Sequence, residues 1–270
     1  MPKEPPGFES FDQMAETTAA GLVQAGAHQA FQLFRDKEFR RLANFDILSQ
    51  GEQDRIFNEL VVSYVVLIML EAPDLRVPPE FRNYLLALKE KIPAAHLDYL
   101  KGLGVEAEHL QRWGKLVDMR HAEYAKDRHE VRAAAMELES AKKPLGLDDL
   151  SKIQMLVPVQ AVDIGCHDHV CRGQTQGRDD LFKLTLRALS RFYVDIRIRM
   201  EGGKINPLTR ARVAWKRVIH RQGKRGKVNE GFWCSSRLSI ARGKIEATRW
   251  TKTREYDCRF AMAVPRGFTR

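Results

Sequence analysis

Residues 49–71 read Ser-Gln-Gly-Glu-Gln-Asp-Arg-Ile-Phe-Asn-Glu-Leu-Val-Val-Ser-Tyr-Val-Val-Leu-Ile-Met-Leu-Glu and contain the longest apolar run of the chain, Leu60–Leu70. Ser49 and Glu52 have the spacing of a capping box, which satisfies the open N–H groups of a helix's first turn. The run is apolar on nearly every side, and such a helix packs at the centre of a bundle. It is shorter than the about 20 residues of a membrane-spanning helix. We therefore expect a buried helix and no transmembrane segment.

Apolar residues three or four positions apart predict further helices on both sides of this one. We expect helices over residues 9–44, from Pro78 until Pro93 breaks the helix, from about Val105 to Ser140, from Leu147 with an interruption at Pro158, and from Asp179 to about Met200.

Three regions follow from this pattern. Residues 1–144 form a helical bundle domain with a long final helix, residues 145–222 form a helical region that contains clustered Cys and His, and residues 223–270 form a basic segment. Alternating residues around the Arg242-Gly243 turn predict a small β-meander in that segment, and the alternative is a partly disordered tail. The predicted fold class is mainly α, a multi-helix bundle with a small basic β-rich C-terminal segment (α+β overall).

The long helix carries apolar or aromatic residues seven positions apart. They are Leu110, Val117, Tyr124, Val131 and Leu138. A seven-residue repeat keeps these side chains on one seam of a helix. The seam indicates a long bundle helix that projects from the bundle or pairs with a second copy, so a homo-oligomer is one hypothesis.

The charge is unevenly distributed along the chain. Residues 1–196 carry 25 Lys+Arg against 30 Asp+Glu, a net of −5, and residues 197–270 carry 20 against 5, a net of +15. A basic end of this kind indicates a polyanionic partner such as nucleic acid, an anionic membrane or an acidic protein surface. The alternative is that it neutralises the acidic part of its own chain or of a twin subunit.

Basic side chains in this end contact phosphate groups, and tryptophan stacks on bases. A helix over Pro207–Arg221 and the segment after it supply the polyanion-binding residues that we expect. They are Arg210, Arg212, Lys216, Arg217, Arg221, Lys224, Arg225, Lys227, Arg249 and Trp250.

The stretch Gly165-Cys-His-Asp-His-Val-Cys-Arg-Gly173 concentrates reactive side chains more than any other. Thiolates and imidazoles are ligands for soft and borderline metals, and we expect zinc or iron. The predicted metal ligands are Cys166, His167, His169 and Cys171. Four ligands on a regular helix cannot all point inward, so this hypothesis requires a loop. The alternatives are a reversible disulfide or redox thiol, or two buried cysteines that flank exposed histidines.

Four cysteines in 270 residues are too few for a disulfide scaffold, which favours a cytoplasmic location with reduced or metal-bound thiols. The sequence contains no phosphate-binding loop, dinucleotide fingerprint or nucleophile elbow. The first hypothesis is a cytoplasmic binding or regulatory protein whose basic C-terminal region binds a polyanion, with a Cys/His metal or redox site. The second is a metal-dependent enzyme that uses the Cys166–Cys171 cluster. The third is a structural or interaction protein that self-associates through the long helix.

Overall fold

The structure is a computed structural model that describes residues 10–141 and 144–201. The described residues are 86% helical, with seven α-helices and no strand. The prediction of a helical bundle is therefore confirmed for this part of the chain. The predicted Pro207–Arg221 helix and β-rich segment 223–270 lie outside the described residues.

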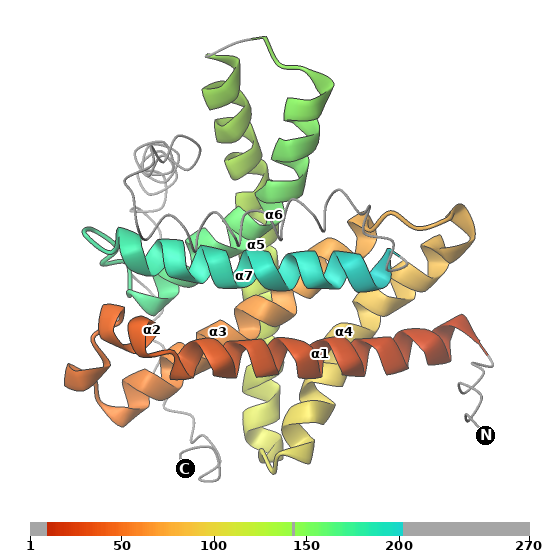
Figure 1. Ribbon diagram of the computed structural model, residues 1–270. Helices are drawn as coiled ribbons and strands as arrows, with labels where there is room; N and C mark the ends of the chain where they lie inside the picture. The colour runs from red at the N-terminus through yellow and green to blue at the C-terminus, as the bar shows by residue number, and fades with distance from the viewer. Residues whose placement is uncertain (1–9, 142–143, 202–270) are drawn as a thin grey trace, which may run out of the picture.

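The helices follow the predicted order closely. They are α1 (Phe11–Arg35), α2 (Lys37–Leu42), α3 (Gln50–Glu71), α4 (Arg82–Gly102), α5 (Ala107–Ser140), α6 (Leu147–Val170) and α7 (Asp179–Met200), with short 3₁₀ turns at Phe45–Ile47, Ala72–Asp74 and Pro79–Phe81 (η1 to η3). In Figure 1, α1 and α7 run across the front of the molecule, while α5 crosses behind them. The loop end of the α5–α6 hairpin stands clear of the other helices at the top of Figure 1.

Helix α3 lies at the centre of the bundle and packs against α1, α4, α5, α6 and α7. Every residue from Leu60 to Leu70 is buried. Within the described residues one helical stretch, Gln50–Asp74, is long and apolar enough to cross a membrane, and 89% of its apolar window is buried inside the protein. This burial agrees with the predicted central helix.

Only half of the predicted capping box forms at the start of α3. The Ser49 hydroxyl accepts the Glu52 backbone N–H at 3.3 Å, as predicted. The Glu52 carboxylate pairs with Arg55 and Arg172. Arg172, which follows α6, thus binds the Glu52 carboxylate that the local sequence predicts to cap the helix.

Two predicted helix breaks are wrong, because α4 runs through Pro93 and α6 runs through Pro158. A proline inside a helix removes one backbone hydrogen bond and costs about 3 kcal/mol. Both prolines are flanked by fully buried apolar side chains, with Ile92 before Pro93 and Val157 and Val159 around Pro158. Burying one such side chain contributes about 1.5–3 kcal/mol, so packing offsets the local cost.

The middle of the seam predicted on the long helix is buried within its own chain, whereas Leu110 and Leu138 at its ends are half-buried. Val117, Tyr124 and Val131 of α5 are all buried against the other helices. Tyr124 meets α6 at Gly165, where a Cβ atom would lie 2.6 Å from Cδ1 of the tyrosine ring and closer still to Cε1. Only glycine allows α5 and α6 to approach this closely.

We expect Gly165→Ala to destabilise the protein by roughly 1–3 kcal/mol, because the new methyl group overlaps a fully buried ring. Urea unfolding followed by circular dichroism measures the change. Gly21→Ala in α1 is the matched control, since no atom lies within 4 Å of a Cβ there. The control gains up to about 1 kcal/mol from the higher helix propensity of alanine. Equal effects of the two substitutions would contradict the close α5–α6 contact.

Candidate functional site

The Cys/His stretch is helical through Val170, in keeping with the predicted helical region, so the loop that the metal hypothesis requires does not form there. Arg55 of α3 stabilises this helix end by donating to the carbonyl oxygens of His169 at 2.6 Å and Val170 at 3.1 Å. Arg172 and Gly173 then adopt positive φ values of 51° and 76°, which terminate the helix. The guanidinium of Arg55 therefore caps a regular helix here, whereas a site with four ligands requires an irregular backbone.

The four predicted metal ligands divide between two places. The His167 ring packs on Phe182, and its Nε2 lies 3.7 Å from the Cys171 sulfur. His169 points to α5, where Nε2 lies 2.9 Å from a carboxylate oxygen of Glu123. Cys166 is fully buried. Within residues 10–141 and 144–201 no group of three or more His, Cys, Asp or Glu side chains is arranged to hold a metal ion. Zinc or iron binding by the full set stays a prediction.

The surroundings of the thiols favour packing over redox chemistry. Cys166 and Cys171 are both free and buried. Burial raises the pKa of the Cys166 thiol far above its usual value, and a thiol that stays protonated is a poor nucleophile. The alternative of two buried cysteines is right for the sulfurs, but it is wrong for His167, which is only 1% exposed.

The Cys/His stretch belongs to a buried ion-pair network that joins three helices. Arg120 of α5 donates to both carboxylate oxygens of Glu59 in α3, at 3.0 and 2.7 Å. It also donates to Glu123 at 3.2 Å, and Glu123 meets His169 of α6. Burial raises the pKa of the Glu59 carboxyl. The hydrogen bonds from Arg120, together with the electrostatic effect of the nearby His169, lower the pKa more, so the net shift is downward. Glu59 therefore stays ionised inside the bundle.

Sequence reasoning missed this network, although one signal was present. Arg120 interrupts the apolar face of the long helix, and Glu59 directly precedes the apolar run of α3. A charged residue on a buried face requires a partner of opposite charge. The pairing itself spans 61 positions and has no local signature.

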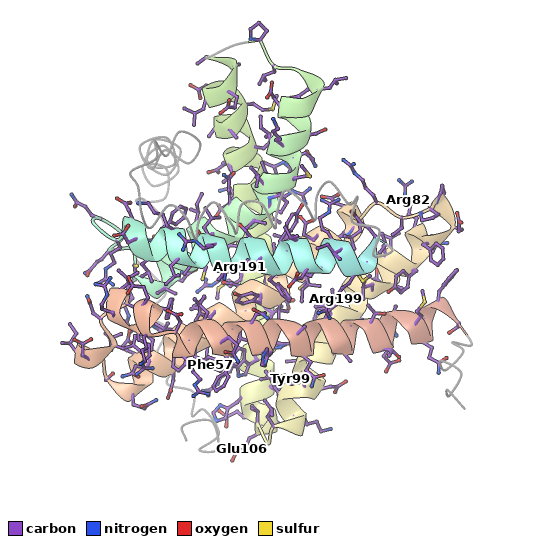
Figure 2. All side chains as sticks on the ribbon, in the orientation of Figure 1. Phe57, Arg82, Tyr99, Glu106, Arg191 and Arg199 are labelled. Atoms are coloured by element: carbon purple, nitrogen blue, oxygen red, sulfur yellow. The ribbon has the colours of Figure 1, made fainter. Side chains whose placement is uncertain are left out.

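A second charged feature lies on the exposed side of α7. Arg187, Arg191 and Arg199 are all exposed, and none of them forms an ion pair or side-chain hydrogen bond within the described part of the chain. Figure 2 labels Arg191 and Arg199 along this helix. Positions four apart lie on one side of a helix and about 6 Å apart along its axis. Asp195 is also exposed between Arg191 and Arg199. We call the three arginines the α7 basic face.

The α7 basic face directly precedes the most basic part of the chain. Residues 202–270 carry 18 Lys+Arg against 4 Asp+Glu, a net of +14, whereas residues 10–201 carry 26 against 29, a net of −3. The polyanion-binding residues predicted from Arg210 to Trp250 lie outside the described residues. The face on α7 is thus the part of this basic region whose geometry is defined.

The chain matches no protein-family model, and the searches of curated proteins and of solved structures return no match. A functional proposal therefore rests on the geometry and charge of the described residues.

The thiols should be protected in the folded protein. We expect Cys166 and Cys171 to react slowly with an alkylating reagent in buffer and rapidly in denaturant, because folding buries both sulfurs. Peptide-level mass spectrometry separates them from Cys234 and Cys258. Rapid native labelling of both would contradict their burial, and metal analysis of the same sample measures bound zinc or iron.

The Glu59–Arg120 pair should behave as a buried ion pair. We expect Arg120→Met to destabilise the protein by roughly 3–5 kcal/mol, because it leaves the Glu59 carboxylate buried without its partner. The double variant Glu59→Gln/Arg120→Met should lose less than the sum of the single changes. Arg112→Met on the same helix is the control, since Arg112 pairs with Glu108 at the surface and exposed pairs contribute about 0–1 kcal/mol. Additive losses in the cycle would show that the pair is not coupled.

Proposed function

We propose that the protein binds a polyanion, with the phosphate backbone of nucleic acid as its ligand, and acts in the cytoplasm as a binding or regulatory protein. One observation carries this proposal. Three exposed arginines that have no carboxylate partner among residues 10–141 and 144–201 lie along α7, immediately before a segment of net charge +14. Clustered cations of this kind attract polyanions by counterion release and long-range electrostatic steering.

The charge balance argues against the alternative of self-neutralisation. The helical body over residues 10–201 has a net charge of only −3, while the segment that follows has +14. Several acidic side chains of the helical body also form ion pairs within it, as Glu52 does with Arg172 and Glu59 does with Arg120. The net charge of the body therefore offsets only a small part of the charge of the segment that follows.

The side chains that α7 exposes favour nucleic acid over a membrane surface as the ligand. A helix that lies in a membrane interface buries an exposed apolar face of Trp, Phe or Leu in the lipid. The large apolar residues of α7, including Leu189 and Phe192, are buried in the bundle, and Val194 is its exposed large apolar residue. The exposed side of α7 thus offers charge for phosphates without a surface for insertion.

Binding through the α7 basic face would depend on salt and little on sequence. Arginines on one helix side reach phosphate groups, and phosphate contacts position a protein without reading bases. The ring of Tyr193 points into the bundle and is buried, so it is not a stacking surface. Base stacking, if it occurs, falls to residues such as Trp250 in the predicted polyanion-binding set.

The other two hypotheses have less support. The metal-dependent enzyme requires Cys166, His167, His169 and Cys171 to share one ion, and the folded helix directs them to different partners. Self-association through the long helix requires its apolar seam, and Val117, Tyr124 and Val131 are already buried within the chain. We therefore keep polyanion binding as the single proposed function.

We expect the full-length protein to bind a 20-base-pair DNA duplex of random sequence at low salt, with affinity that falls steeply as salt rises. The triple variant Arg187→Gln/Arg191→Gln/Arg199→Gln should make the negative slope of log affinity against log salt less steep by up to about 3. Each lost phosphate contact removes about one unit from the magnitude of this slope. Fluorescence anisotropy at several salt concentrations measures the slope.

The matched control is Arg82→Gln/Lys101→Gln/Arg132→Gln. It removes the same charge from exposed positions on α4 and α5 and should leave the slope close to that of the wild type. An equal loss in both triple variants would assign the effect to net charge instead of the α7 basic face. No binding by the wild type at low salt would remove the proposed function.

A further inference from the structure

A buried carboxylate marks the end of the central helix. Glu71 is the last residue of α3 and is only 1% exposed. Neither of its carboxylate oxygens has a hydrogen bond of normal geometry within the described residues, although the Tyr193 hydroxyl lies close enough to lower its pKa. The nearest cation is Arg197 of α7, whose Nη1 lies 3.8 Å from Glu71 Oε2. Glu71 is therefore a carboxylate out of water. Its ion-pair partner, Arg197, is distant and is shared with other groups.

Arg197 is mainly engaged by a second carboxylate. Its Nε and Nη2 donate to Glu201 Oε1 at 2.9 and 2.5 Å, and its Nη1 donates to the Tyr193 hydroxyl at 2.7 Å. Glu201 Oε1 also accepts the backbone N–H of Arg76 at 3.1 Å. Arg197 and Glu201 thus fasten the end of α7 to the chain that follows α3.

The other charged groups around Glu71 are already paired. Asp74 of η2 binds Arg128 of α5, which also donates to the Leu70 carbonyl at 3.4 Å. With Glu71 neutral, the two guanidinium groups of Arg128 and Arg197 balance the carboxylates of Asp74 and Glu201. An ionised Glu71 adds one buried negative charge without a matching cation, which is costly in an apolar interior.

The pKa of Glu71 is raised to about 7, mainly by burial and also by Asp74, although Arg197, Arg128 and a hydrogen bond from the Tyr193 hydroxyl oppose the shift. The folded protein therefore holds this proton up to about pH 7, whereas the unfolded chain releases it near the ordinary value of 4.5. The free energy of unfolding contributed by this group consequently decreases as pH rises from about 4.5 to about 7. Burial raises the pKa of Tyr193 to about 12, so this phenol stays neutral throughout that range.

We propose that Glu71, Arg197 and Glu201 form a proton-controlled latch at the end of α7. When Glu71 is protonated, Arg197 holds Glu201, and Glu201 holds the Arg76 amide. When Glu71 loses its proton to solvent, its carboxylate draws the Arg197 guanidinium from Glu201. Glu201 then releases the Arg76 amide, and the last turn of α7 is freed from the chain after α3.

The latch would regulate the proposed polyanion site, and this consequence rests on the proposed function. Arg199 lies within the turn that the latch holds, and the basic residues 202–270 follow it directly in the chain. A released turn changes where Arg199 stands relative to Arg187 and Arg191. The affinity for a polyanion should then differ on the two sides of pH 7 in the wild type and not in a protein whose latch cannot titrate.

Hydrogen exchange of the Arg76 amide reports the latch without any ligand, because this amide donates to Glu201. After correction for intrinsic exchange, we expect its protection in full-length protein to fall by about tenfold from pH 6 to pH 8. This change corresponds to a one-unit difference in the pKa of Glu71 between the latched and released states. Glu71→Gln should keep high protection at both pH values, because its side chain is neutral throughout.

Two further variants fix the interpretation. Glu80→Gln removes an exposed carboxylate nearby and should show the wild-type pH response. Glu201→Gln weakens the charged clamp on the Arg76 amide and should show low protection at both pH values. Equal pH responses in wild type and Glu71→Gln, or wild-type protection in Glu201→Gln, would overturn the latch.

Duplex binding at pH 6 and pH 8 then separates the two proposals. A pH-dependent affinity in the wild type that is lost in Glu71→Gln supports the regulatory role, and a parallel response in the two proteins overturns it. The absence of duplex binding by every variant at both pH values removes the proposed function, whereas the exchange result decides on the latch by itself.

Discussion

Enclosing α3 on every side takes a carboxylate at each end of its apolar run out of water. Glu59 precedes Leu60–Leu70 and Glu71 follows it, and both side chains are buried. A buried charge requires a partner of opposite sign or must be neutralised by a proton. The packing of α5 and α7 around α3 follows this constraint, because α5 supplies Arg120 to one end and α7 supplies Arg197 to the other.

The two ends meet the constraint in different ways. Glu59 receives two hydrogen bonds from a buried guanidinium, which lower the pKa of its carboxyl and keep it charged. Glu71 shares its arginine with Glu201 and Tyr193, and its pKa rises to about 7. One end of the central helix is thus a fixed ionic contact that organises the Cys/His stretch, and the other is a titratable contact beside the α7 basic face.

Local sequence was informative where neighbouring residues decide the structure. The capping serine at Ser49, the helix start at Asp179 and the length of the long helix all appear as predicted. It was misleading at Pro93 and Pro158, where buried apolar neighbours carry the helix through a residue that normally ends it. It gave no sign of the cap on the helix end at Cys166–Cys171, because that cap comes from Arg55, more than a hundred positions away.

The sequence by itself determined that the described part of this protein is helical, that residues 60–70 lie at the centre of the bundle and that the positive charge of the chain gathers at one end. These properties depend on spacing and composition, which can be read along the chain. The tertiary structure decided which cation meets each buried carboxylate, that Gly165 receives the Tyr124 ring, and that three arginines of α7 face outward with no ion-pair partner in the part of the chain that the structure describes. Such pairings arise only when distant helices pack, because the low dielectric of the interior makes each polar contact depend on its whole surroundings.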